Sequence, residues 1–281
     1  MSGTLKDKKT LVTGAASGIG RATALAAARD GAQLFLTDIN EDGLKETADL
    51  AVDVGGTVAY FKALDISDYD AVTEFATEVH SQVESLDVVM NIAGISAWGT
   101  VENLEHHHWK SLVDVNLMGP IHVIENFIPP MIKAGKGGNL VNVSSAAGLL
   151  ALPWHAAYSA SKYGLRGVSE VLQFDLKRHH ISVHLVVPGA VKTPLVDSFV
   201  VVGVDKEDPR VKRYMHEFEK RAISPNTAAD AIMKGIEKDR FLVYTSRDIQ
   251  FGYWWARKFA PPYNWLMQKA NDRFSRFLPP A

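Results

Sequence analysis

The chain has 281 residues, of which 47% are hydrophobic and 22% charged, and these proportions exclude a disordered protein. The formal net charge of -2 gives no long-range attraction to nucleic acid, so we expect no such partner. There are no cysteines, which excludes disulfides, thiolate zinc sites and cysteine nucleophiles.

The N-terminal segment predicts a cytoplasmic protein. Residues 1–9 are polar, and the short apolar run that follows leads directly to Gly14, which leaves no room for a cleavable signal. No uninterrupted apolar run is as long as a membrane span.

Short apolar or β-branched runs alternate with longer amphipathic or alanine-rich stretches along the chain. The predicted strands are Thr10–Val12, Gln33–Thr37, Thr57–Phe61, Val88–Met90, Leu140–Val143, Val183–Val187 and Phe241–Tyr244. The alternation indicates a parallel sheet, because each crossover between parallel strands needs a covering helix. We predict an α/β protein with a single doubly wound Rossmann fold: a mostly parallel seven-stranded sheet with helices on both faces.

Two long helices are predicted in the middle of the chain. Leu104–Ile132 is expected to form one helix, ended by Pro129-Pro130 and then by the loop Gly135–Gly138, and Tyr158–Lys177 is expected to form the other. A long insertion, 194–221, then precedes a helix that starts near Thr227.

The first predicted strand leads into a glycine-rich loop with the sequence TGAASGIG, residues 13–20. Its glycines allow a tight turn and the close approach of a pyrophosphate, and the helix that follows offers unpaired amide donors. Such a loop alone is a weak signal, but its place in a βαβ unit favours a dinucleotide site. The candidate cofactor-binding residues here are Gly14, Ser17, Gly18, Ile19 and Gly20.

Asp38 ends the second predicted strand and bears on the choice of cofactor. A carboxylate accepts hydrogen bonds from the adenosine ribose hydroxyls and repels a 2′-phosphate. Ser17 and Ile39 are neutral where a phosphate site would place bases, and Arg21 is the one nearby cation. We therefore expect NAD, with NADP as the less favoured cofactor.

Tyr158 and Lys162 stand four residues apart on a predicted helix, which places both side chains on one face. A lysine charge favours phenolate over phenol, and together with a cationic cofactor ring it could bring the tyrosine pKa near neutrality, so the tyrosine becomes a usable acid or base. Ser145 follows the strand that ends at Val143, where its hydroxyl could hold a carbonyl or alcohol oxygen. A Tyr/Lys pair is common by accident on helices, and only the rest of the chain makes this pair a catalytic candidate.

In combination, these motifs resemble those of the short-chain dehydrogenase/reductase family over about residues 5–245. The resemblance also rests on the NIAG sequence at 91–94, on Asn116, and on Pro188-Gly189 followed by Thr193. It implies that Tyr158 is the acid/base, that Lys162 lowers its pKa and binds the nicotinamide ribose, and that Ser145 orients the reacting oxygen. Asn116 is expected to interrupt its helix and to hold a water that links Lys162 to solvent.

The resemblance implies further contacts to the cofactor. Those to adenine and its ribose are expected from Asp65, Ile66, Asn91, Ala93 and Gly94, and those to the nicotinamide from Pro188, Gly189, Val191 and Thr193. Ile92 departs from the family, in which a second asparagine is frequent. The resemblance also implies a homo-oligomer, a tetramer or dimer, built through the two long central helices.

The resulting prediction of domains is a Rossmann domain over 1–250, with a substrate lid at about 194–222, and an aromatic C-terminal extension over 251–281. The extension could cap the substrate cleft, pack across a subunit boundary or lie on a membrane surface. Subunit or self-packing is preferred, because the basic charge is sparse for lipid binding, and peripheral membrane contact is the less favoured alternative.

Several aromatic residues and histidines allow more than one interpretation. His106-His107-His108 suggests a metal, but adjacent helical residues point in different directions, so a solvated helix start is favoured and no metal site is predicted. His155 either faces the pocket or is a loop histidine without a role. Trp98 and Trp154 are candidate pocket walls or plain core residues.

The sequence thus predicts an oxidoreductase that transfers a hydride between NAD and a secondary alcohol or ketone. A hydrophobic substrate of lipid, steroid or terpenoid type is expected from the apolar residues Trp98, Leu149, Leu150, Leu152, Trp154, Leu195, Val196, Phe199 and Val200. The alternatives are an NADP-dependent carbonyl reductase and a non-catalytic nucleotide-binding regulatory protein.

Overall fold

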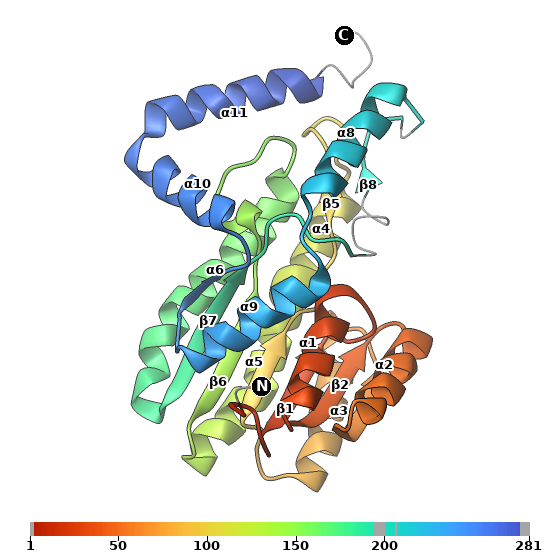
Figure 1. Ribbon diagram of the computed structural model, residues 1–281, viewed down its shortest axis with the longest axis vertical. Helices are drawn as coiled ribbons and strands as arrows, with labels where there is room; N and C mark the ends of the chain where they lie inside the picture. The colour runs from red at the N-terminus through yellow and green to blue at the C-terminus, as the bar shows by residue number, and fades with distance from the viewer. Residues whose placement is uncertain (1–2, 194–199, 206, 276–281) are drawn as a thin grey trace.

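The computed structural model describes residues 3–193, 200–205 and 207–275 (Figure 1). Its main sheet has seven parallel strands in the order β3-β2-β1-β4-β6-β7-β9. These strands are β1 Lys9–Thr13, β2 Gln33–Asp38, β3 Thr57–Ala63, β4 Val88–Asn91, β6 Gly138–Val143, β7 Ile181–Val187 and β9 Leu242–Tyr244. The predicted doubly wound fold is confirmed, and every predicted strand lies within two residues of its expected bounds.

Helices cover both faces of the sheet, as the near-continuous apolar strands predict. The helices are α1 Gly18–Arg29, α2 Glu41–Asp53, α3 Tyr69–Gln82, α4 His106–Val113, α5 Gly119–Ala134, α6 Ala156–Asp175, α8 Pro209–Arg221, α9 Pro225–Glu237, α10 Arg247–Lys258 and α11 Ala260–Ser275. Val12 and Leu34 pack under α1, α2 and α9, whereas their neighbours Leu11 and Phe35 pack under α3 and α5. Successive residues of a strand therefore pack into two separate hydrophobic cores, one on each face of the sheet.

The first predicted long helix is interrupted in the structure. It begins at His106 and is divided by a π-helical segment, Asp114–Met118, into α4 and α5. Pro129 and Pro130 lie inside α5 rather than ending it. Proline has no backbone N–H, so each of these two residues removes one hydrogen bond from the helix. The flanking Ile128 and Met131 are buried in the core, and their packing holds the helix together.

Gly135, the first residue of the predicted loop, ends α5. It has a left-handed backbone, φ +66°, and its N–H donates to the carbonyls of Met131 and Ile132. A glycine at this position is favoured because other residues pay a steric cost there.

The insertion and the C-terminal extension extend beyond the carboxyl edge of the sheet (Figure 1). A two-stranded parallel sheet joins β5 Ala97–Trp98 to β8 Val200–Val201, and α8 follows it. Residues 194–199, which belong to the predicted lid, lie outside the described residues. None of the helices in the described part of the chain combines the length and apolar character needed to cross a bilayer.

Candidate active site

The chemistry-bearing motifs all follow the carboxyl ends of parallel strands. The glycine loop follows β1, Asp38 ends β2, Asn91 ends β4, Ser145 follows β6 and Pro188 follows β7. Because the strands are parallel, these ends share one edge of the sheet, which is where doubly wound folds bind ligands. The fold thus brings together motifs that are far apart in the sequence.

The glycine loop fits a pyrophosphate group. Gly14 has φ +68°, and a Cβ added there would lie 2.7 Å from the backbone of Ala93, so a larger residue would clash. Thr13 Oγ1 accepts hydrogen bonds from the N–H groups of Ile92 (3.0 Å) and Ala93 (3.1 Å), which ties the loop to the end of β4. The Ser17 side chain makes no capping hydrogen bond to α1, so it leaves the amides of the first turn available to an anion.

Asp38 lies beside this loop. Its Oδ2 accepts a hydrogen bond from Ala16 N–H and its Oδ1 accepts one from Asn40 N–H, each at 2.9 Å. Arg21 is directed to α2, where it pairs with Glu46 (2.5 Å) and donates to Thr47 Oγ1 (2.9 Å). The arginine is therefore held by partners of its own, and the carboxylate is the charged group at the end of β2.

Ser145, Tyr158 and Lys162 line one cavity of about 550 Å³. Lys162 Nζ donates to Val143 O at 3.0 Å and lies 5.9 Å from the centre of the Tyr158 ring. Ser144 Oγ donates to Lys162 O at 3.0 Å, which fixes the first half of α6 against the end of β6. The face of α6 that bears Tyr158 and Lys162 therefore meets the end of β6, as the sequence predicts.

Burial dominates the acid–base properties of these groups. It raises the pKa of the Tyr158 phenol, while the hydrogen bond with Ser145 acts in the opposite direction. Burial also lowers the pKa of Lys162 to about 8. The protein environment alone therefore favours the neutral phenol, and the lowered pKa expected from Lys162 together with a cationic cofactor ring stays a prediction.

Asn116 lies in the π-helical segment, so the expected interruption of its helix is observed. Its Oδ1 accepts from Ile95 N–H and its Nδ2 donates to Ile95 O, both at 2.9 Å, and Nδ2 also lies 3.3 Å from Ser161 Oγ. A Cβ added at Gly94 would lie 2.8 Å from Asn116 Oδ1 and 3.3 Å from Lys162 Nζ. Asn116 thus links α6 to the loop after β4.

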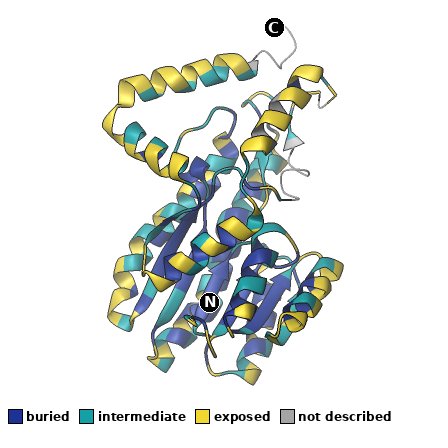
Figure 2. Cartoon of the chain, viewed as in Figure 1, coloured by how far each residue is buried: buried dark blue, intermediate teal, exposed yellow. Residues whose placement is uncertain are grey.

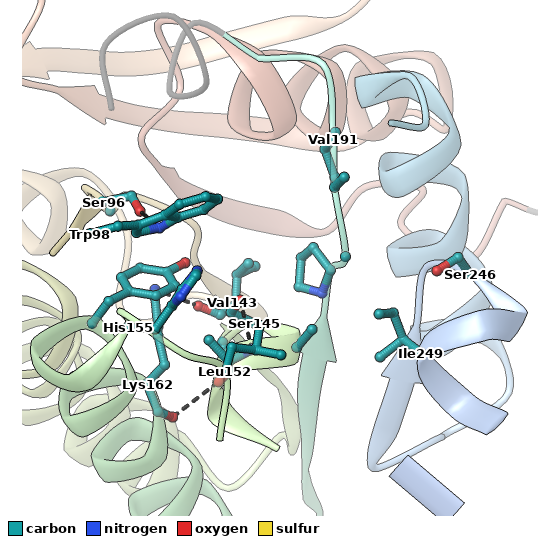
Figure 3. Close-up of a pocket in the computed structure, with 18 of the residues that line it drawn as sticks. Ser96, Trp98, Val143, Ser145, Leu152, His155, Lys162, Val191, Ser246 and Ile249 are labelled. Carbon is teal, nitrogen blue, oxygen red and sulfur yellow. Dashed lines mark hydrogen bonds between the residues drawn. The ribbon is translucent and has the colours of Figure 1, made fainter. Parts of the chain in front are cut away.

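His155 and Trp98 form one side of the cavity, as Figure 3 shows. Their ring centres are 4.2 Å apart. His155 Nδ1 lies 2.6 Å from Pro153 O, and because a carbonyl only accepts, this nitrogen carries the hydrogen. Burial lowers the pKa of His155 to about 4, so the ring is neutral at physiological pH. Of the two interpretations of His155, the structure supports the pocket-facing one.

The C-terminal extension supplies another part of the cavity wall. Met267, Ala270 and Phe274 of α11 line it, and the Phe274 ring packs edge-on against Trp154 with ring centres 5.6 Å apart. The side-chain oxygen of Tyr263 accepts from Ala151 N–H at 2.8 Å. Of the three roles considered for the extension, capping of the cleft is thus observed within the chain.

Sequence reasoning did not select the individual α11 residues that line the cavity. Their spacing of three and four places them on one face of a helix, but nothing local shows which face meets the cavity. Also missed were Ser96, Arg221, Ile223, Ser246, Asp248 and Ile249, all of which line it.

The predicted site residues fall into two groups. Those that line the cavity are Ile19, Gly94, Ser145, Tyr158, Lys162, Pro188, Gly189, Val191 and Thr193. Those that do not line it are Gly14, Ser17, Gly18, Gly20, Asp38, Asp65, Ile66, Asn91, Ala93 and Asn116. Asn91 donates instead to Asn142 Oδ1 at 2.9 Å, and Asp65 accepts from Ser67. The predicted contacts of both groups with a cofactor stay predictions.

The apolar residues from which an apolar substrate was predicted also divide into those that line the cavity and those that do not. Trp98 and Leu152 line the cavity, whereas Leu149 packs with Leu185, Val187 and Tyr253 in a separate core, and Leu150 packs against that core. Leu195, Val196 and Phe199 lie outside the described residues, and Val200 belongs to β8.

The triple histidine forms a helix start, as expected. His106 begins α4, and His108 Nδ1 accepts from Glu105 N–H at 3.1 Å as part of a capping box. Across the described ranges, no three histidine, aspartate or glutamate side chains gather in a way that could hold a metal ion.

Comparison with known proteins identifies the family. A family model described as "short chain dehydrogenase" matches residues 8–200. The chain belongs to the short-chain dehydrogenase family. A relative from Mycobacterium tuberculosis, described as "Putative oxidoreductase SadH", is 35% identical over 271 residues, which cover 95% of this chain and 96% of the relative.

Solved structures of similar proteins contain either nicotinamide cofactor. A short-chain dehydrogenase/reductase from Burkholderia phymatum in complex with NAD aligns with a TM-score of 0.82 and 25% identity, over 91% of this chain and 94% of that one. A metagenomic short-chain oxidoreductase in complex with NADP aligns with a TM-score of 0.68 and 29% identity, over 86% and 96%. Membership of the family therefore implies a nicotinamide cofactor without deciding which one.

Proposed function

We propose that this short-chain dehydrogenase interconverts a secondary alcohol and a ketone, with Tyr158 as the acid/base. The observation that carries the proposal is that Ser145, Tyr158 and Lys162 line the same cavity as Ile19 of the glycine loop and Pro188 after β7. A cofactor on the glycine loop and a substrate in the cavity would therefore meet beside the phenol.

Each of the three polar residues has a distinct role in this proposal. The Tyr158 hydroxyl gives a proton to the carbonyl oxygen during reduction and takes it back during oxidation, and Ser145 Oγ orients that oxygen. The buried Lys162 ammonium stabilises the phenolate form through its charge. Asn116 positions Lys162 through the loop after β4, and the water expected beside it would carry the proton to solvent. The cofactor supplies or accepts the hydride when bound.

We propose NAD as the cofactor. Two observations support this choice. The Asp38 carboxylate would repel the 2′-phosphate of NADP, and Arg21, which could otherwise neutralise that phosphate, is already paired with Glu46. Gly14, Ser17, Gly18, Ile19 and Gly20 would hold the pyrophosphate, and the residues after β3, β4 and β7 would contact adenine and nicotinamide, as the family pattern implies.

The lining of the cavity supports an apolar substrate. Trp98, Leu152, Met267 and Phe274 present apolar surface, and a volume of about 550 Å³ lies in the range of sites for small molecules. We therefore propose a ring-containing or long-chain alcohol of lipid, steroid or terpenoid type.

We also propose a homo-oligomer formed through α5 and α6. Phe174 and Val171 on α6 are 72% and 58% exposed, which is costly for large apolar side chains unless another surface covers them. The cytoplasmic location and the division of the chain near residue 250 stay predictions.

The decisive experiment measures reduced nicotinamide formed from NAD or NADP with a panel of secondary alcohols that increase in size and apolar surface. We expect turnover with NAD and a KM that falls as apolar surface grows. Tight NAD binding without turnover of any alcohol or ketone would favour the regulatory protein, and faster turnover with NADP would favour the carbonyl reductase.

A further inference from the structure

The outer side of α10 and α11 carries an apolar and basic surface that the cavity does not use. Five large side chains on these helices and at the residue between them are at least 44% exposed; they are Phe251, Trp254, Phe259, Trp265 and Leu266. Figure 2 shows exposed residues along both helices, which project from the body of the molecule. We call these five residues the outer patch.

The outer patch is continuous from α10 to Phe259, which follows it. The ring centres of Phe251 and Trp254 are 5.8 Å apart, and those of Trp254 and Phe259 are 6.1 Å apart. On α11, Trp265 lies two positions before the cavity-lining Met267, so a rotation of about 200° places it on the far side of the helix. One side of α11 thus faces the cavity, and the opposite side bears an exposed tryptophan.

Basic charge accompanies the patch. Residues 247–275 contain five basic and two acidic side chains, a net charge of +3, whereas the whole chain has a net charge of -2. Lys258 and Lys269 are exposed, and Lys269 Nζ lies 5.7 Å from the centre of the Trp265 ring. An exposed tryptophan beside a lysine is the combination found where helices lie at a lipid headgroup boundary.

We propose that the outer patch docks this protein on an anionic lipid surface, with α10 and α11 lying on the membrane rather than crossing it. A second copy of the chain is the rival occupant. A symmetric contact would place one basic patch against another, and like charges across an interface oppose association. The charge therefore favours lipid, in place of the packing preferred on sequence alone. The inference does not depend on the proposed reaction.

The test is flotation with vesicles of phosphatidylcholine alone and of phosphatidylcholine with about a quarter phosphatidylserine. We expect the intact protein to float with the anionic vesicles and to be released by high salt. The double variant Trp254→Ser/Trp265→Ser should bind at least about tenfold more weakly, because two amphipathic rings are lost from the boundary. Lys258→Glu/Lys269→Glu should weaken binding by a similar factor.

The matched control is Val52→Ser/Val101→Ser, which removes two exposed apolar side chains on other parts of the surface and should bind as the parent does. Circular dichroism and the thermal unfolding midpoint show whether each variant folds. Failure of the intact protein to float would overturn the proposal, as would equal binding by the patch variants. A patch variant that changes the oligomer mass, with no flotation of the parent, would assign the patch to a contact between copies instead.

Discussion

The two sides of the cavity are built in different ways. Ser145, Tyr158 and Lys162 stand where β6 and α6 meet, and buried hydrogen bonds from Lys162 Nζ and Ser144 Oγ hold that junction together. The α11 side is half-buried, and it is joined to the loop before α6 through Tyr263 and Phe274. The first side is therefore rigid, whereas the second can change in sequence without disturbing the sheet.

This difference separates two properties of a dehydrogenase. A proton transfer needs its groups held to within a fraction of an ångström, which a packed junction provides. Selection of an apolar substrate needs only surface of suitable size and shape, which a peripheral helix can provide. We therefore expect changes on the inner side to act on kcat, and changes on α11 to act on KM.

The largest effect is expected from Tyr158→Phe. Loss of the hydroxyl removes the group that moves the proton while the ring still fills its place, so kcat should fall by about a thousandfold or more and NAD affinity should change little. Steady-state kinetics and calorimetric titration with NAD measure the two quantities.

Tyr163→Phe is the matched control for that variant. It removes a phenol from the same helix, one that is 38% exposed and is absent from the cavity lining. If Tyr158→Phe keeps more than about a tenth of the parent kcat, Tyr158 is not the acid/base.

His155 lies where the two sides meet and should make stability depend on pH. Its pKa is lowered from about 6.5 to about 4 on folding, so the unfolded chain binds more protons between these values, and stability falls as the pH falls through this window. The loss attributable to this residue is at most about 3 kcal/mol.

Chemical denaturation at pH 7 and at a pH near 4.5 should therefore separate His155→Gln from the parent protein. The variant should lose less stability on acidification, whereas His107→Gln, on the exposed start of α4, should follow the parent. If acidification lowers the free energy of unfolding equally in His155→Gln and in the parent, the burial of His155 does not destabilise the protein in acid.

The strand ends could be predicted because they depend on local pattern. An apolar run that stops at a glycine or an acid marks the end of a buried strand, and a four-residue spacing sets one face of a helix, so Ser145, Tyr158 and Lys162 were assigned correctly to the end of β6 and to α6. Pro129 and Pro130 misled the prediction, because packing of their buried neighbours in the core outweighs the lost hydrogen bonds.

The α11 side could not be predicted, because it depends on contacts between distant residues. Tyr263 meets Ala151 across 112 positions of sequence, and the extension alone does not show which of its aromatic rings turn inward. The burial of His155 likewise depends on Trp98, which comes from β5. The periodicity of a sequence shows which face of an element is apolar, but it does not show which distant residues will surround a given side chain.

A smaller effect, on cofactor choice alone, is expected from Asp38→Asn. The variant keeps an acceptor oxygen for only one of the two amides, Ala16 or Asn40, and loses the charge, so NAD should bind about tenfold to a hundredfold more weakly and NADP should bind more tightly. Titration with both cofactors checks this, with Asp42→Asn on the first turn of α2 as the control. A parent protein that already prefers NADP would contradict the assignment.

The smallest effect is expected from the α11 side, in Phe274→Ala. The lost ring contributes partly buried apolar surface to the cavity, so KM for a bulky apolar alcohol should rise about fivefold to tenfold while kcat stays nearly constant. A small alcohol that does not reach α11 should show little change in either constant. Phe259→Ala removes a ring from the same extension outside the cavity and should leave both constants at the parent values.

Deletion of the chain after Phe259 extends this test to the whole of α11. It keeps Tyr253, which is only 8% exposed and hydrogen-bonded to Arg166 at 2.9 Å, so the core beneath α10 stays intact. We expect the shortened protein to retain kcat for a small alcohol and to lose its preference for large apolar ones. A fall in kcat for every substrate would mean that α11 also holds the inner side in place, and the separation of chemistry from selection would then fail.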